Sequence, residues 1–353
     1  MSTFEQPPPN VPHQINLKAD SCLSRSTLQF MRGVTADEHA PQPILTVVVV
    51  AYRHENYIEE CLASINRTLM QSIELLVIDD GSPDSTLRKC LDFQFRSDID
   101  VRVYTKTNQG LVHSLFNGLE LARGRYISIM ASDDCYMDHG LDAALRYLQE
   151  NPDTDALLCQ AETIGLIGGM AYGTIMEAFF GLTPLERLEA IWSEAPAPML
   201  LQATIFNAKF LRSINPWADN LELDDWPTFI RVFAAEAMFG AKVRYCPELI
   251  LSKYRIHSEG SHAKLDRHLR IIEQVANEFV PEKYRNICLA NARVDIGIGN
   301  IREGRLLNGL CLLGCAIFFN AFVHSVVRVL KRGVNIILKR IRPLLFWQFE
   351  KPS

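Results

Sequence analysis

The feature that most constrains the fold is a run of β-branched residues, ILTVVVVAY, at residues 44–52. A nearly unbroken apolar run of this kind is typical of a central parallel strand that is covered on both faces. A segment with helical spacing follows it, and a second apolar run, IELLVIDD, occupies residues 73–80. Strand patterns recur at 101–106 and from Tyr126 to Met130, each separated by a helical pattern. Strands that alternate with helices predict an α/β fold with a doubly wound, mainly parallel sheet flanked by helices.

Polar residues follow three of these strands at the point where each strand ends. They are Arg53-His54-Glu55, Asp79-Asp80 and Asp133-Asp134. In parallel sheets ligands bind beyond the carboxyl ends of the strands, so these residues are expected to share one crevice. Neither a dinucleotide-binding GxGxxG after the first strand nor a P-loop is present, so a bound phosphate would need a cation held by carboxylates.

The composition of the chain bears on its partners, on its cysteines and on its N-terminal segment. The formal net charge of -5 gives no reason to expect nucleic-acid binding. The nine cysteines include no C-x-x-C pair, which fits free thiols in a reducing cytoplasm. Residues 1–43 are rich in proline and polar residues and lack a signal-peptide pattern, so we expect an extended N-terminal arm.

Five segments, taken in order, resemble the family 2 glycosyltransferases. They are Ala51-Tyr52, VIDDGSPDST, NQGLVHSLFNGLELARGRYISIMASDD, LDDWPTFIR and YRIHSEGS. The resemblance implies a GT-A catalytic domain over residues 44–262 and leaves a helical C-terminal region at 263–353. It also implies an inverting transferase that moves a sugar from a nucleotide diphosphate, with a UDP-sugar expected, to an acceptor hydroxyl on a glycan or lipid-linked glycan. The setting it implies is bacterial surface polysaccharide synthesis (O-antigen, capsule or exopolysaccharide) in the cytoplasm, at the inner face of the membrane.

The resemblance assigns a divalent cation, Mn²⁺ or Mg²⁺, to the second pair of acids. Asp133 and Asp134 match the metal motif D-x-D and its following acid, and His257 in the pattern Y-R-x-H is a further candidate ligand. Asp133 ranks above Asp134 as the direct ligand. The first acid of the D-x-D is replaced by Ala131, which puts a ribose or secondary metal contact in doubt. The alternative for the acid pair is a helix N-cap.

The same resemblance assigns catalysis and nucleotide binding. Asp225 matches the catalytic base, with Asp224 and Arg231 in support, although acids at a helix N-terminus would show the same pattern. Asp80 matches the carboxylate that accepts from the nucleobase, and its alternative is a turn-stabilising Asp. The predicted nucleotide-binding residues are Tyr52, Glu55, Asp80, Asn108, Asp133 and Arg255.

The C-terminal sequence suggests contact with a membrane. Residues 306–327 carry no Lys, Arg, Asp or Glu, and six basic residues follow between Arg328 and Arg342, interleaved with apolar ones. This pattern favours peripheral attachment to anionic lipid, with a membrane span or an ordinary helical cap as alternatives. Two other functions remain open: a sugar nucleotidyltransferase, and a catalytically silent protein that binds nucleotide sugars or membranes.

Overall fold

The computed structural model describes residues 29–30, 42–68, 72–165, 168–193, 199–219, 221–257, 265–302 and 304–318. The chain divides into two compact units. The first comprises Met1–Glu189 and Pro198–Gly260, and the second comprises Ala190–Ala197 and Ser261–Ser353. Most of the expected N-terminal arm, and all of the tail after residue 318, lie outside the described residues.

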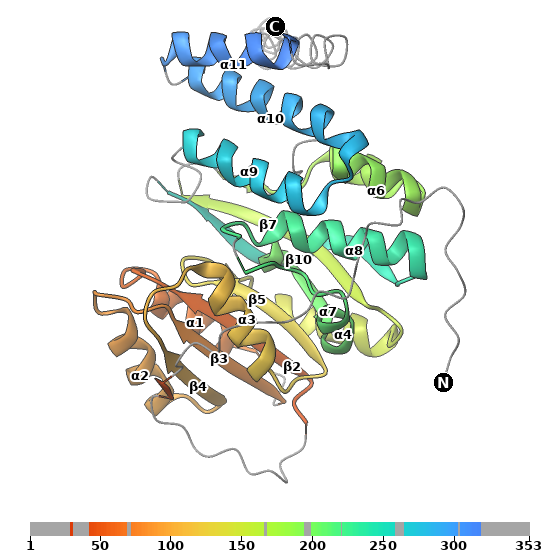
Figure 1. Ribbon diagram of the computed structural model, residues 1–353. Coiled ribbons are helices and arrows are strands. Elements are labelled where there is room, and N and C mark those ends of the chain that lie inside the picture. Colours follow the sequence, from red (N-terminus) through yellow and green to blue (C-terminus); the bar gives the residue numbers. More distant parts are fainter. Residues whose placement is uncertain are drawn as a thin grey trace, which may run out of the picture. The chain divides into compact units, whose positions relative to one another are not determined.

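The first unit is built on a mixed sheet whose central strands are parallel (Figure 1). The run that opens the folded sequence forms β2 (Leu45–Ala51), and all seven of its residues are buried. It lies between β3 (Ile73–Asp79) and β5 (Tyr126–Ala131), and β4 (Asp100–Thr105) pairs with the far side of β3. The predicted doubly wound, mainly parallel sheet is confirmed.

Beyond β5 the sheet changes direction before it becomes parallel again. The short strand β9 (Thr204–Asn207) is antiparallel to both β5 and β7 (Ala156–Gly165). The long strand β10 (Val243–Ile256) then runs parallel to β7. Three two-residue strands, all antiparallel to their partners, complete the sheet: β1 (Gln29–Phe30), β6 (Cys135–Tyr136) and β8 (Gly169–Met170).

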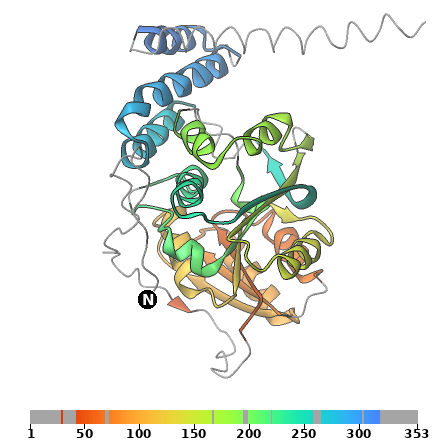
Figure 2. The same ribbon diagram turned by 90° about the vertical axis from the view of Figure 1, so that its right-hand side faces the viewer.

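Helices cover both faces of this sheet (Figures 1 and 2). One face packs Val47 and Val49 with the apolar sides of α1 (Ile58–Asn66), α2 (Thr86–Arg96) and α4 (Gly140–Glu150).

On the opposite face, α3 (Leu111–Leu121) approaches β2 so closely that a Cβ added at Gly118 would lie 2.4 Å from Cγ1 of Val48. This face also carries α8 (Asp225–Phe239), whose Phe229 ring lies 6.5 Å from that of Phe206 on β9. The chain also forms α5 (Thr174–Phe180), α6 (Pro184–Ser193), the 3₁₀ turn η1 (Leu201–Ala203) and α7 (Ala208–Ser213).

The second unit contains the predicted helical C-terminal region. Its helices are α9 (Leu265–Phe279), α10 (Glu282–Arg302) and α11 (Leu306–Phe318). Helices α10 and α11 cross at two glycines: a Cβ added at Gly309 would lie 2.6 Å from the carbonyl oxygen of Gly297. Only residues without a side chain permit this approach, because a methyl group would collide with the facing backbone.

Candidate active site

The register of the sheet brings the polar strand ends to one edge. Ala51 is paired with Asp79, and Val50 is paired with Ala131. The residues that follow β2, β3 and β5 therefore leave the sheet side by side, as the sequence analysis expected for parallel strands. All of the predicted site residues belong to the first unit.

The Asp80 carboxylate is buried and bonds to three donors of the β4–α3 segment. It forms an ion pair with Lys106 and accepts from the backbone N–H groups of Gln109 (3.0 Å) and Gly110 (2.8 Å). A carboxylate has about four lone-pair positions, so these three donors leave capacity for one more. Its neighbour Asp79 accepts from the hydroxyl of Thr105 at 2.7 Å and holds the strand ends together.

The two acids after β5 have different environments. The Asp134 carboxylate is 2% exposed, and its oxygens accept from the backbone N–H of Arg255 (2.7 Å) and from the side-chain amide of Gln202 (2.9 Å). Burial, followed by the charge of Asp133, raises the pKa of Asp134 to about 8. The Asp133 side chain is 17% exposed. Asp133 is therefore the acid that faces outward, while Asp134 is bonded into the framework.

Two imidazoles flank Asp133. His257 Nε2 lies 3.0 Å from Asp133 Oδ2, and His54 Nδ1 lies 3.8 Å from Asp133 Oδ1. The Tyr57 ring lies next to both imidazoles, with centroid separations of 5.2 Å to His257 and 6.0 Å to His54.

Arg255 connects this cluster to α1. Its guanidinium donates to the carbonyl of Asp133 (2.9 Å) and to the carboxylate of Glu60 (2.6 Å), and it lies over the ring of Tyr57. The predicted phosphate contact of Arg255 would therefore compete with Glu60. In that pair the Glu60 side chain is 54% exposed and the Arg255 side chain is 17% exposed, so solvent screens the attraction in part.

Asp225 begins helix α8, and Asp224 is its N-cap residue. The Asp224 carbonyl accepts from Trp217 Nε1 (3.0 Å) and from the hydroxyl of Thr228 (2.6 Å), which fixes the entry of the chain into the helix. Burial raises the pKa of Asp225 to about 6. Arg231 lies six residues further along the same helix.

Tyr254 on β10 is close enough to both groups of acids for their charges to affect it. Burial raises its pKa, and after burial the negative charges of Asp134, Asp133, Asp225 and Asp224 do so. One side chain therefore lies within electrostatic range of both acid pairs, which are about 90 residues apart in the sequence. The structure thus brings together the predicted base and the predicted metal ligands.

The remaining predicted nucleotide-binding residues differ in whether their side chains are exposed or are bonded within the protein. Tyr52 is 40% exposed beyond the end of β2, and Asn108 is exposed in the loop before α3. Both side chains are accessible to a ligand at this edge. The Glu55 carboxylate instead accepts from the backbone N–H of Ser85 at 3.0 Å, next to the start of α2.

The donors at Asp133 fit a divalent cation only with help from a substrate. Within the described ranges, no three His, Cys, Asp or Glu side chains form a group that could hold a metal ion alone. Asp133 and His257 offer one carboxylate and one imidazole, and no group in the described part of the chain bonds to the buried Nδ1 of His257. Hard cations such as Mg²⁺ often take one or two protein ligands and complete their shell with phosphate oxygens. The residues present fit that arrangement.

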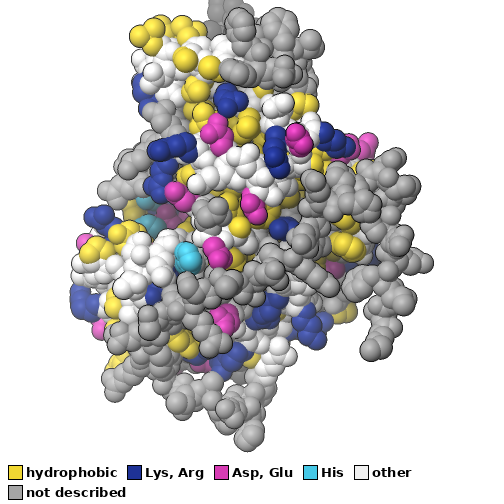
Figure 3. Space-filling view, in the orientation of Figure 1, with side chains coloured by type: hydrophobic (Ala, Val, Ile, Leu, Met, Phe, Trp, Pro, Cys, Tyr) yellow, Lys and Arg dark blue, Asp and Glu magenta, His cyan; other side chains and the backbone are white. Residues whose placement is uncertain are grey.

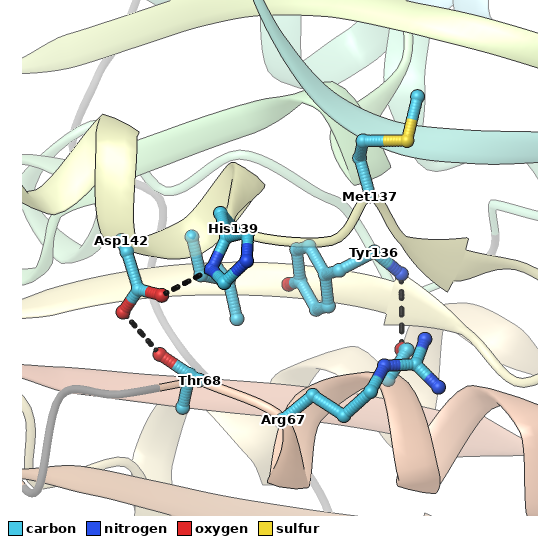
Figure 4. A pocket seen from close by; sticks show the side chains of 8 residues that line it. Arg67, Thr68, Tyr136, Met137, His139 and Asp142 are labelled. Atoms are coloured by element: carbon cyan, nitrogen blue, oxygen red, sulfur yellow. Dashed lines mark hydrogen bonds and ion pairs between the residues drawn. The ribbon is translucent and has the colours of Figure 1, made fainter.

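A small pocket lies apart from this edge, between the end of α1 and the start of α4 (Figure 4). In it Asp142 accepts from the hydroxyl of Thr68 at 2.7 Å and lies 3.6 Å from Nδ1 of His139. Tyr136 donates its backbone N–H to Ser64. These contacts tie α4 to α1.

Sequence reasoning missed three contributors to the site. Gln202 and Tyr57 lie in segments that carried no recognised motif, and Tyr254 was noted only as part of Y-R-x-H. A helix-start pattern located Tyr57 near the first strand end, but nothing local showed that its ring lies beside that of His257. Gln202 meets Asp134 only because β9 inserts between β5 and β7.

Solved structures with low sequence identity share this fold. The S. aureus TarS fragment 1–349 in complex with UDP-GlcNAc has a TM-score of 0.54 at 19% identity, covering 77% of this chain and 80% of that one. The mannosyltransferase PcManGT from Pyrobaculum calidifontis, in complex with GDP-Man and Mn²⁺, has a TM-score of 0.52 at 18% identity, covering 86% of this chain and 83% of that one. The fold is that of the GT-A glycosyltransferases.

Part of the chain is similar in sequence to known glycosyltransferases. Residues 46–198 match the model described as glycosyl transferase family 2. An uncharacterized glycosyltransferase of Haemophilus influenzae is 33% identical over 134 residues, which are 36% of this chain and 41% of that protein. The glycosyltransferase GlyG of Streptococcus pneumoniae is 33% identical over 116 residues, which are 33% of this chain and 38% of that protein. These matches span less than half the length of either relative.

Proposed function

We propose that this protein is an inverting glycosyltransferase that moves a sugar from a nucleotide diphosphate, with a UDP-sugar as the first candidate, to an acceptor hydroxyl. The observation that carries the proposal is that Tyr254 lies within electrostatic range of both the acids that follow β5 and those at the start of α8. An inverting transfer needs a base on the face of the sugar opposite the leaving group. The acids that follow β5 and the acids at the start of α8 are on separate elements of the fold. The complexes of TarS with UDP-GlcNAc and of PcManGT with GDP-Man support a nucleotide-sugar donor.

In this proposal Asp225 is the base. Its carboxylate takes the proton of the acceptor hydroxyl as the oxygen attacks the donor sugar, and the nucleotide diphosphate leaves. A pKa near 6 keeps the carboxylate ionised at neutral pH, and it makes Asp225 a stronger base than an ordinary aspartate. Asp224 holds the start of the helix in place through its carbonyl contacts.

The donor would be held by the residues at the sheet edge. Asp80 would accept from the nucleobase, Tyr52 and Asn108 would line its site, and Asp133 with His257 would hold Mn²⁺ or Mg²⁺. A cation bound there neutralises the diphosphate and stabilises the charge of the leaving group. The complex of PcManGT with Mn²⁺ supports the choice of cation.

The test of this function is turnover of a panel of UDP- and GDP-sugars by the purified full chain with Mn²⁺, measured as release of UDP or GDP. Release of UDP or GDP from one of the donors, abolished by EDTA, supports the proposal. Binding of a nucleotide sugar without release of UDP or GDP, in the presence of candidate acceptors, would indicate a catalytically silent protein that binds nucleotide sugars. The replacement of the first D-x-D acid by Ala131 is the reason to test for this alternative. Formation of a nucleotide sugar from a sugar phosphate and a nucleoside triphosphate would indicate the nucleotidyltransferase.

The pH dependence of the reaction follows from Asp225. Because only the ionised carboxylate accepts a proton, kcat/KM is expected to rise about tenfold per pH unit below pH 6 and to level off above it. A profile measured from about pH 4.5 to 8 checks this. A rate that falls as the pH rises through 6 would contradict the role of Asp225 as a base.

We also propose that the C-terminal region attaches the protein to the inner face of the cell membrane, where a lipid-linked glycan acceptor of surface polysaccharide synthesis would be presented. In α11, Leu306, Leu307 and Leu310 are 55%, 82% and 52% exposed, and the helix carries no charged residue. None of the helices in the described ranges is long and apolar enough to cross a membrane. The basic residues from Arg328 to Arg342 lie outside the described residues.

High salt is expected to release part of the full-length protein from anionic vesicles, because it screens the attraction between basic side chains and lipid headgroups. Removal of residues 306–353 should abolish binding, whereas the exposed leucines should leave a salt-resistant fraction in the intact chain. Vesicle flotation with neutral and anionic lipids measures both effects. Intact protein that stays wholly unbound at low salt would contradict the attachment.

Figure 3 shows acidic and basic side chains interspersed over the face in view, among the residues that are coloured.

A further inference from the structure

His54 is held in one position by the end of β2 and the start of α1. Its backbone N–H donates to the hydroxyl of Thr86 (2.9 Å), and its carbonyl accepts from the N–H groups of Tyr57 and Ile58 at the start of α1. Arg53, just before it, has a φ of 57°, in the left-handed region that is unfavourable for a residue with a side chain. This strained turn places the imidazole of His54 beside Asp133.

The hydrogen bond to Ser132 fixes the tautomer of this imidazole. The Ser132 hydroxyl is buried and lies 2.7 Å from Nδ1 of His54, and among the described residues it has no other acceptor. A buried hydroxyl is expected to donate its proton, so Nδ1 accepts and the neutral ring carries its proton on Nε2. In the described part of the chain, no group accepts from that Nε2–H, although the ring is 27% exposed.

We propose that His54 binds the diphosphate of the nucleotide donor, with its Nε2–H donating to a phosphate oxygen next to Asp133. This inference rests on the proposed function and adds a residue to it. A phosphate oxygen bridging to a cation on Asp133 would lie beside a fixed, unused donor, and hydrogen bonds to charged oxygens are stronger than neutral ones.

Two substitutions separate the two nitrogens of the ring. His54→Asn retains an acceptor at the position of Nδ1 for Ser132 but removes Nε2, whereas His54→Gln extends an amide N–H to the position of Nε2. His139→Asn is the matched control, because His139 lies in the pocket of Figure 4 and its φ of 61° suits asparagine. The affinities of all four proteins for UDP, GDP and uridine, with Mn²⁺, are measured by calorimetry or by competition.

We expect His54→Asn to weaken binding of the preferred diphosphate roughly tenfold or more, since a hydrogen bond to a charged group is lost. Uridine affinity should not change, His54→Gln should recover most of the loss, and His139→Asn should match the wild type. Equal diphosphate affinity in His54→Asn and the wild type would overturn the inference alone. A proportional loss of uridine affinity would overturn it too, because His54 would then shape the site without contacting phosphate. If the wild type bound neither UDP nor GDP, the proposed function would fail first, and the inference with it.

Discussion

Replacing Asp225 by asparagine is expected to lower kcat by roughly 10²–10⁴-fold while the affinity for the donor nucleotide stays near that of the wild type. Asparagine has the same size and still accepts from the backbone N–H of Trp226, as Asp225 does at 2.6 Å, so the start of α8 should be preserved. It cannot take a proton from the acceptor. The donor is assigned to Asp80, Asp133 and His257, on other elements, so its binding should not depend on this carboxylate.

Asp224→Asn is the matched control for that experiment. The contacts that fix the helix start use the backbone carbonyl of Asp224, which the substitution leaves unchanged, so a smaller loss of turnover is expected. Donor affinity by calorimetry and turnover with saturating donor are measured for both variants. Near-normal turnover in Asp225→Asn, or a loss of donor affinity as large as the loss of activity, would show that Asp225 is not the base.

The second large effect is expected at Asp133. Asp133→Ala should abolish the Mn²⁺-dependent part of UDP affinity, because His257 alone is a weak site for a hard cation that prefers oxygen ligands. The fold should survive, since the Asp133 carboxylate is partly exposed and its hydrogen bond to His257 is at the surface of the cluster. Binding of UDP with Mn²⁺ and with EDTA measures the effect.

Asp134→Asn tests whether the cation selects between the adjacent acids. The Asp134 side chain is buried, and its pKa near 8 means that it is largely protonated at neutral pH. An asparagine can accept from the N–H of Arg255 and pair with a reoriented Gln202 amide, so metal-dependent binding should persist. If the UDP affinities of the wild type and Asp133→Ala depended equally on Mn²⁺, or if only Asp134→Asn lost this dependence, the metal ligand would be Asp134 and not Asp133.

The central part of the fold could be predicted because its signals are local. Each of β2, β3 and β5 is an apolar run that ends in polar residues, and parallel pairing then places those ends at one edge. The place of the antiparallel strand β9 in the sheet could not be predicted in the same way. It depends on partners more than 40 residues away in β7 and more than 70 away in β5.

The candidate site was predictable in the identity of its acids but not in their environments. Asp133 and Asp134 are adjacent and chemically identical in the sequence, and the strand end alone does not show which one turns inward. That choice is made by Gln202 and by the backbone of Arg255, 68 and 121 residues further along the chain. The engagement of Asp80 by Lys106 and the α3 loop is likewise a tertiary contact that no motif encodes.

The end of β10 has a consequence for the order in which the molecule folds. Arg255 joins Glu60 across 195 residues, and His257 joins Asp133 across 124 residues. Contacts between such distant positions form late, because a long loop must close before they contribute any stability. During synthesis, a nascent chain that has not yet reached residue 257 already contains the β2–β5 sheet and Asp225, but it lacks the histidine beside Asp133. We therefore expect affinity for a metal-bound nucleotide to appear only in the last stage of folding of the first unit, when β10 adds to β7.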